Sequence, residues 1–272
     1  MRYPKCNLHT HTCFCDGKNT PREMVLSAID QGMETLGFSG HSYTPFCLSA
    51  TMLPEEEALY RKEVLALKEE FADQICILLG IEQDICSAPI REKYDFVIGS
   101  VHYLHVNGEY CEVDESAQRQ CSVVQRHFGG DFYRFVSAYY EAVAQVADKT
   151  ECDIVGHFDL VTKFNEGNRY FDESDPRYLK AALDALDVLL EKDVLFEINT
   201  GAISRGYRRT PYPGPILLHR IAEKRGRVTF SADAHAKEGL LCGFEDSLKL
   251  ARSAGLGSIT MRTKEGWREF AF

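Results

Sequence analysis

Histidine and acidic residues occur in closely spaced pairs near both ends of the chain. His9 and His11 lie in "CNLHTHTCFCDG", and Asp233 and His235 lie in "SADAH". Residues two apart on an extended strand point to the same side, so each pair can direct two donor groups into one site. Neutral imidazoles and carboxylates are the usual ligands of zinc, iron and manganese. The pairs therefore indicate a metal centre, provided that the fold brings them together.

Short apolar segments, typical of buried strands, alternate with amphipathic segments, typical of helices. Helices are predicted to begin at Pro21, Pro54, Pro176 and Pro215, the first with Thr20 as its N-cap. The seven predicted strands are residues 6–9 and the segments "ETLGFSG", "ICILLGI", "DFVIGSV", "CDIVGHF", "DVLFEIN" and "RVTFSAD". This alternation favours an α/β fold of parallel strands, either closed into a barrel or open and doubly wound. The segment "GLGSITM" is a candidate eighth strand, and residues 104–130 and 163–174 are predicted to be irregular loops.

Polar side chains follow the C-terminal end of every predicted strand. In chain order they are His9, His11, His41, Glu82, His102, His157, Asn199, Asp233 and His235. In barrels these strand ends converge on one rim, where active sites are built. Isolated histidines such as His127 and His219 are expected to be surface or core residues and not ligands, and His105 is expected to be a loop residue near the substrate. Cys13 and Cys15 lie beyond the first strand and are not counted among the ligands.

The length, net charge and cysteine content of the chain limit the classes of protein to which it can belong. With 272 residues the chain has the length of one barrel, so a single domain over residues 1–272 is predicted. The formal net charge of −10 argues against a nucleic-acid partner. No signal peptide or membrane span is recognised, and the ten cysteines are scattered. We therefore predict a cytoplasmic protein with reduced thiols and no membrane partner, and a homo-oligomer is left open.

A set of short motifs occurs in a characteristic order: "HTHT", "DG", "GH", "GIE", "GSVH", "GHFDL" and "SADAH". In these motifs the chain resembles the PHP (polymerase and histidinol phosphatase) phosphoesterases, and among them the histidinol-phosphate phosphatases. The resemblance covers nearly the whole chain. It implies a distorted (β/α)7 TIM-like barrel in a single domain, in agreement with the seven predicted strands.

The resemblance also implies a centre of three divalent metal ions, which zinc, iron or manganese could occupy. The implied ligands are His9, His11, Glu82 and Asp233 for the first ion, Glu82 as a bridge with His102 and His157 for the second, and Asp16, His41 and His235 for the third. Many histidinol phosphatases that this chain resembles carry histidine where it has Asp16. An aspartate would still ligate, but the third ion's identity and occupancy depend on it.

The implied activity is a metal-dependent phosphomonoesterase that converts L-histidinol phosphate and water to L-histidinol and phosphate in histidine biosynthesis. A hydroxide bridging two metals would be the nucleophile, and the catalytic residues would be Glu82, Asp233 and His235. The substrate-binding candidates are Arg205, Asn199, Lys163 and Asp159, with Glu112 or Asp114 for the cationic groups of histidinol. Arg208 and Arg209 are expected to be solvated.

Two alternatives remain at this point. The first keeps the metal site and changes the substrate to another small phosphomonoester, a phosphotyrosyl protein or a nucleic acid 3′ end. The second is a metal-binding domain without catalytic activity. A complete ligand set favours an enzyme over the second alternative, because a domain that had lost its activity would be expected to lack several ligands.

Overall fold

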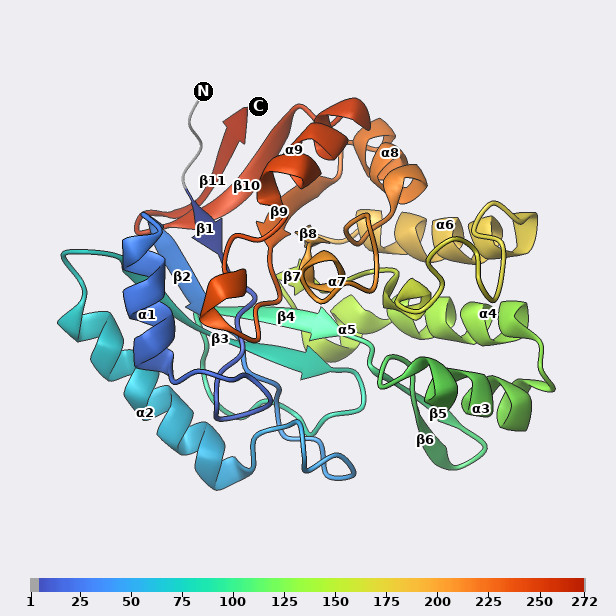
Figure 1. Ribbon diagram of the computed structural model, residues 1–272, viewed down its shortest axis with the longest axis horizontal. Helices are drawn as coiled ribbons and strands as arrows, with labels where there is room; N and C mark the ends of the chain where they lie inside the picture. The colour runs from blue at the N-terminus through green and yellow to red at the C-terminus, as the bar shows by residue number, and fades with distance from the viewer. Residues whose placement is uncertain (1–4, 272) are drawn as a thin grey trace.

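Seven parallel strands form the centre of the molecule, as predicted (Figure 1). The computed structural model describes residues 5–271. In sheet order the strands are β1 (Cys6–Asn7), β2 (Thr35–Phe38), β3 (Cys76–Asp84), β4 (Phe96–Ser100), β7 (Ile154–Val155), β8 (Leu195–Asn199) and β9 (Arg227–Ser231). Beyond β9, Ala234 bonds to the chain that follows β1, through His9 O at 3.0 Å and His11 N at 2.9 Å. The sheet is therefore a nearly closed barrel.

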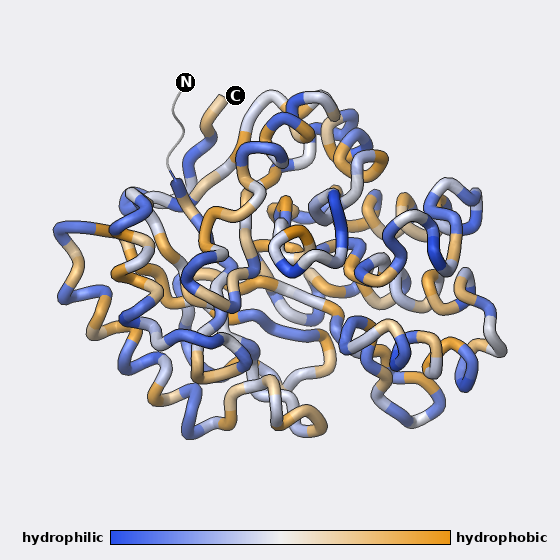
Figure 2. The backbone as a smooth tube through the Cα atoms, viewed as in Figure 1, coloured by the Kyte–Doolittle hydropathy of each residue, from blue (hydrophilic) through white to orange (hydrophobic). Residues whose placement is uncertain are grey.

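Helices cover the outside of this barrel. The four predicted helices are α1 (Pro21–Asp30), α2 (Pro54–Glu70), α6 (Pro176–Leu190) and α8 (Pro215–Glu223). The others are α3 (Ala117–Phe128), α4 (Phe132–Val143), α5 (Val146–Thr150), α7 (Gly201–Ser204), α9 (Phe244–Ser253) and the 3-10 turns η1 (Leu160–Thr162) and η2 (Lys237–Gly239). Thr20 and Glu23 form the capping box that the sequence predicts for α1. Along the outer helices hydrophobic and hydrophilic residues alternate, as a surface helix requires (Figure 2).

The barrel wall is packed tightly enough to require glycine at one position. A Cβ atom at Gly80 would lie only 2.2 Å from the Phe96 ring of the neighbouring strand. All nine residues of β3 are buried, so this strand reads as a continuous apolar run until Glu82. Side chains alternate along the strand, and Glu82 therefore points to the opposite side from Ile81 and Gln83.

Predictions about two of the remaining segments need correction. The segment "GLGSITM" does contain a strand, β10 (Ser258–Thr263), but within residues 5–271 this strand pairs with β11 (Gly266–Ala271) in a separate antiparallel hairpin and is not an eighth strand of the barrel. Residues 104–130 are largely regular, since they contain the hairpin β5 (Tyr103–Val106) and β6 (Glu109–Glu112) and helix α3. Asn107 and Gly108 form the hairpin turn with φ of 52° and 82°, the conformation for which an Asn-Gly pair is favoured.

Residues 163–174 form an irregular segment, as predicted. In Figure 1 the arrowheads of β3 and β4 point toward the β5–β6 hairpin and α3, so these elements lie beyond the C-terminal ends of the strands. Between residues 5 and 271 no helix combines the length and the apolar character needed to cross a membrane. The cytoplasmic location stays a prediction.

Candidate metal centre

Nine histidine and acidic side chains meet at the C-terminal ends of the barrel strands. We call six of them the inner group: His9, His11, Glu82, His102, His157 and Asp233. The other three, Asp16, His41 and His235, are the outer group. Together they make up four overlapping sets in which one donor atom from each residue lies within 4.8 Å of the others. Every metal ligand proposed from the sequence belongs to one of these sets, and the ligand roles themselves stay predictions.

Glu82 lies at the middle of the inner group. Its Oε2 atom is 3.2 Å from His9 Nε2 and 3.0 Å from His41 Nδ1. Its Oε1 atom is 3.0 Å from His157 Nε2 and 3.4 Å from His102 Nε2. The two oxygens thus face different pairs of imidazoles, an arrangement that suits a carboxylate bridging two cations.

The backbone around Glu82 explains why these groups converge. Glu82 N donates to Gly40 O and Ser42 N donates to Glu82 O, which fixes His41 beside the carboxylate. Ser100 at the end of β4 donates its hydroxyl to Glu82 Oε1 at 2.6 Å. Neighbouring parallel strands therefore position the carboxylate from both sides.

Buried donor atoms without a partner test whether the site fits a metal ion. His9 Nε2, His11 Nε2 and Glu82 Oε2 are all inaccessible to solvent and have no hydrogen-bond partner among residues 5–271. Leaving such atoms unpaired costs free energy, whereas binding a cation would satisfy all three at once. The donor set of imidazoles and carboxylates fits a divalent ion such as zinc or manganese.

Electrostatics keeps the acidic members of the site ionised. Burial alone would raise the pKa of Glu82, but the imidazoles of His9, His41 and His102 hold it well below its usual value. Asp233 also has a lowered pKa, because Arg205 and nearby imidazoles outweigh its burial. Burial together with the charges of His235 and His41 lowers the pKa of His11 to about 3, so this ring is neutral and can offer a lone pair.

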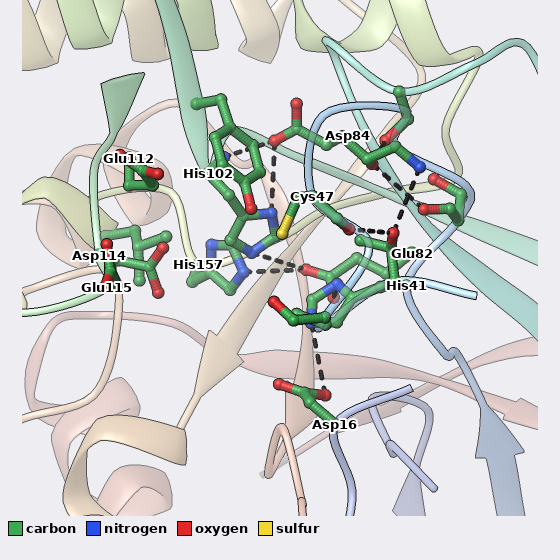
Figure 3. A pocket seen from close by; sticks show the side chains of 18 of the residues that line it. Asp16, His41, Cys47, Glu82, Asp84, His102, Glu112, Asp114, Glu115 and His157 are labelled. Carbon is green, nitrogen blue, oxygen red and sulfur yellow. Dashed lines mark hydrogen bonds and ion pairs between the residues drawn. The ribbon is translucent and has the colours of Figure 1, made fainter. Parts of the chain in front are cut away.

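A cavity of about 560 Å³ opens over these groups. In Figure 3, His41, Glu82, His102 and His157 lie in its middle, Asp16 lies at one end, and Glu112, Asp114 and Glu115 form an acidic wall at one side. Tyr207 and Leu160 also line the cavity. The mouth of the barrel therefore has room for a small molecule between the candidate ligands and a wall of carboxylates.

Two of the four predicted substrate-binding residues line this cavity. Arg205 donates from Nη2 to Asp233 Oδ2 at 2.9 Å and from Nη1 to Asp233 O at 3.0 Å, which holds it against the inner group. Lys163 donates to Asp114 Oδ2 at 2.9 Å and to Asp114 O at 2.7 Å. Both cations are thus held beside the place where an anion would bind.

The other two, Asn199 and Asp159, are buried behind the cavity. Asn199 donates its amide to Glu197 Oε1 at 2.7 Å and accepts from Gly201 N at 2.8 Å. Asp159 accepts from Gly214 N at 2.9 Å, and burial raises its pKa to about 7. Because these contacts tie both side chains to the protein itself, the structure gives no support to their predicted contact with substrate.

Two carboxylates beside the ligands were missed from the sequence. Asp84 accepts from His102 N at 2.5 Å, and its Oδ2 is 3.3 Å from His102 Nδ1. Glu197 Oε2 is 2.9 Å from His9 Nδ1. Each lies two residues from a predicted strand-end residue, Glu82 or Asn199, and so points to the same side of its strand. This spacing of two residues is the feature of the sequence from which both carboxylates could have been predicted.

Other expectations about single residues are corrected here. Arg208 is buried, not solvated, because its guanidinium pairs with Glu173 at 2.7 and 3.1 Å. His105 lies on strand β5, with its ring stacked on Tyr110. Cys15, which was not counted among the ligands, belongs to none of the four sets, although its Sγ atom lies 3.6 Å from His11 Nδ1.

Comparisons with known proteins agree with this geometry. The PHP domain matches residues 7–201. The chain is 32% identical over 276 residues to a protein of Deinococcus radiodurans named "Probable histidinol-phosphatase", covering 96% of this chain and 97% of that protein.

Two solved structures share the fold. The first, from Listeria monocytogenes, has a TM-score of 0.78 at 21% identity and covers 89% of this chain and 99% of its own. The second is histidinol phosphate phosphatase from Lactococcus lactis, complexed with zinc, L-histidinol and phosphate. It has a TM-score of 0.70 at 23% identity and covers 97% of this chain and 98% of its own. The predicted barrel is therefore confirmed by comparison as well as by its strands.

Proposed function

Because the chain belongs to the PHP domain family, we propose that it is a metal-dependent phosphatase that hydrolyses L-histidinol phosphate to L-histidinol and phosphate. The observation that carries the proposal is the convergence of nine candidate ligands with Arg205 at one cavity. The names of the relatives in D. radiodurans and L. lactis support this choice of substrate.

Three divalent ions, zinc, iron or manganese, fit the nine ligands. The proposed ligands are His9, His11, Glu82 and Asp233 for one ion, Glu82, His102 and His157 for the second, and Asp16, His41 and His235 for the third. When bound, such ions neutralise phosphate oxygens and lower the pKa of a water molecule so that it can attack phosphorus. Glu82 and Asp233 contribute the negative charge that holds the cations together.

Arg205 binds the phosphate group in this proposal. A guanidinium matches phosphate oxygens with two parallel hydrogen bonds, and this one is oriented in advance by Asp233. His235 lies beside it, 3.0 Å from Arg205 Nη1 and 3.1 Å from Asp16 Oδ2. From this position His235 can protonate the leaving oxygen or hold the outer ion.

The acidic wall recognises the cationic part of the substrate. Histidinol carries an amine and an imidazole, and Asp114 lies in the cavity with its pKa lowered to about 2, chiefly by Lys163 against the effect of burial. Glu112 forms an ion pair with Arg119, with 2.9 Å between the charged groups. Asp114 is likewise paired with Lys163 at 2.9 Å, so both carboxylates stay candidates for the amine. A wall of carboxylates disfavours a nucleic acid 3′ end, whose own phosphates it would repel.

A substrate panel tests the proposal. Phosphate release is measured from L-histidinol phosphate, p-nitrophenyl phosphate, a phosphotyrosyl peptide and a nucleoside 3′-phosphate, with the enzyme metal-free, zinc-loaded or manganese-loaded. We expect the largest kcat/KM for L-histidinol phosphate, with activity abolished by chelator and restored by metal. Full activity of the His9→Ala, Glu82→Ala double variant would refute the metal-dependent reaction, and a preference for another substrate would refute the specificity.

A further inference from the structure

Glu197 lies on β8, behind the metal centre and away from the cavity. Its carboxylate is fully buried and accepts four hydrogen bonds. Oε2 accepts from His9 Nδ1 at 2.9 Å and from Ser231 Oγ at 2.6 Å. Oε1 accepts from His157 N at 2.6 Å and from Asn199 Nδ2 at 2.7 Å. The residue therefore contacts one proposed ligand through its ring and another through its backbone.

These contacts determine which nitrogen of His9 can bind a metal ion. An ionised carboxylate only accepts hydrogen bonds, so the proton must lie on the Nδ1 atom that faces Glu197. In the neutral ring that metal binding requires, the lone pair then lies on Nε2, which is 3.2 Å from Glu82 Oε2 and 3.8 Å from Asp233 Oδ1 and has no hydrogen-bond partner of its own among residues 5–271. Nε2 is the nitrogen that points into the inner group.

We propose that Glu197 is a positioning residue, which fixes His9 as the Nδ1–H tautomer and aims its Nε2 lone pair at a divalent ion. The inference rests on the metal-binding part of the proposed function and not on the choice of substrate. Metal-bound histidines commonly donate their second ring N–H to a carboxylate, which sets the orientation of the ring.

The other oxygen of Glu197 extends this role to the second ion. By accepting from His157 N, it fixes the start of the segment that carries the His157 ring toward Glu82. Asn199 is itself held by Gly201 N and keeps its amide directed at Glu197. One carboxylate thus ties together ligands from the first and fifth strands of the barrel, and Asn199 supports it from behind instead of contacting substrate.

The test replaces the carboxylate by an amide of the same shape. In Glu197→Gln one oxygen becomes an N–H₂ group, so the four donors around it can no longer all find an acceptor. We expect the affinity of the tightest zinc ion to fall by roughly 10- to 100-fold, the usual effect of losing such a partner. Affinity is measured by competition with a chromophoric chelator, in the absence of substrate. Glu197→Asp, which retains the charge on a shorter side chain, is expected to recover part of the affinity.

A second measurement reports the tautomer directly. In zinc-loaded protein with ¹⁵N-labelled histidine, two-bond ¹H–¹⁵N correlations should show that His9 is protonated on Nδ1. The matched control is Thr229→Val, since Thr229 lies beside Glu197 in the sheet register, is buried, and has a hydroxyl without a hydrogen-bond partner in the described chain. This variant should keep both the zinc affinity and the His9 signal.

Three results would overturn the inference. These are unchanged zinc affinity in Glu197→Gln, an equal loss in Thr229→Val, or a His9 ring protonated on Nε2 in the zinc-loaded wild-type protein. The last measurement needs no variant, so it decides the matter even if Glu197→Gln fails to fold. A protein that binds zinc in this way but does not hydrolyse L-histidinol phosphate would refute the proposed substrate and leave the role of Glu197 standing.

Discussion

The inner and outer groups of the metal centre differ in how the chain holds them. Side chains of the inner group are at most 13% exposed, whereas those of the outer group are between 16% and 34% exposed. Two inner imidazoles have a carboxylate behind them, Glu197 for His9 and Asp84 for His102. The inner group is therefore organised before any ion binds.

In the outer group, His41 is fixed by backbone bonds to Glu82, but Asp16 and His235 depend on connecting segments. Asp16 lies in the turn between β1 and α1, and His235 follows β9; the two are held to each other at 3.1 Å. His11 joins the groups, because its ring stacks on that of His235 with 4.1 Å between centroids. Residues of the same types within one cluster can therefore differ in how rigidly the chain holds them. We expect the inner positions to bind metal more tightly than the outer one.

The largest loss of activity should follow from Glu82→Ala, which removes the carboxylate that contacts imidazoles of both the inner and the outer group. Losing a residue that only orients a ligand costs about 10- to 100-fold, so losing a bridging ligand should reduce kcat/KM by more than roughly 100-fold. Bound metal should fall at the same time, as measured by elemental analysis after dialysis. Gln83→Met is the control, since Gln83 points to the other side of β3 and should leave activity nearly unchanged. Comparable activity in both variants would contradict a central role for Glu82.

A smaller effect is expected from Asp16→Ala, which removes a donor of the outer group. One metal equivalent should be lost while the inner ions remain, and kcat/KM should fall by about 10- to 100-fold. Graded chelation of the unaltered protein should likewise release one equivalent before the others. Cys13→Ala is the matched control, because Cys13 is exposed in the same turn and belongs to none of the ligand sets. Loss of all metal from Asp16→Ala would show that the two groups are not separable.

The sequence predicted well which polar residues meet at the rim, because their positions follow from a simple rule. A polar residue that ends an apolar run must lie at the rim of a parallel barrel, whatever the details of packing. His41, Glu82 and His157 could all be placed at the rim in this way. Helix ends were equally predictable where a local hydrogen bond fixes them, as Thr20 does for α1.

Features that depend on contacts between distant segments could not be predicted in the same way. Glu197 looked like part of an apolar strand, and its role emerges only when the barrel brings His9 beside it from 188 residues away. Arg208 looked like a solvated residue because its partner Glu173 lies in another loop, 35 residues earlier. Asn199 was correctly placed at a strand end, but its hydrogen bonds turn it toward Glu197. The rule that a polar residue at the end of an apolar strand lies at the rim predicts where that residue is, but not which residues it contacts.

Arg205→Lys is expected to have a more selective effect, because it preserves the charge but removes the fork that Asp233 orients. A charged hydrogen bond contributes about 1.5–3 kcal/mol, so loss of one at the phosphate should raise KM by roughly 10-fold or more. Bound metal should stay the same, which separates this variant from those of the ligand groups. Arg209→Lys serves as the control, since Arg209 is 92% exposed on the same loop. An unchanged KM for Arg205→Lys would remove Arg205 from the phosphate site.

The smallest effect should come from Asp16→His, which keeps a donor at the outer position and changes its chemistry. Asp16 lies 3.1 Å from His235 Nε2 and 3.7 Å from His41 Nε2, so an imidazole here would complete an outer set of three histidines. Imidazole suits zinc, whereas carboxylate also suits manganese, and the substitution removes one negative charge that attracts cations. We therefore expect activity with zinc to stay within about threefold of the original and activity with manganese to fall further. Measuring kcat/KM with zinc and with manganese at the same concentration shows whether the two activities fall by different factors. An equal fall with both metals would mean that the outer position responds to the shape of residue 16 and not to its donor atom, because only a donor effect depends on which ion is bound.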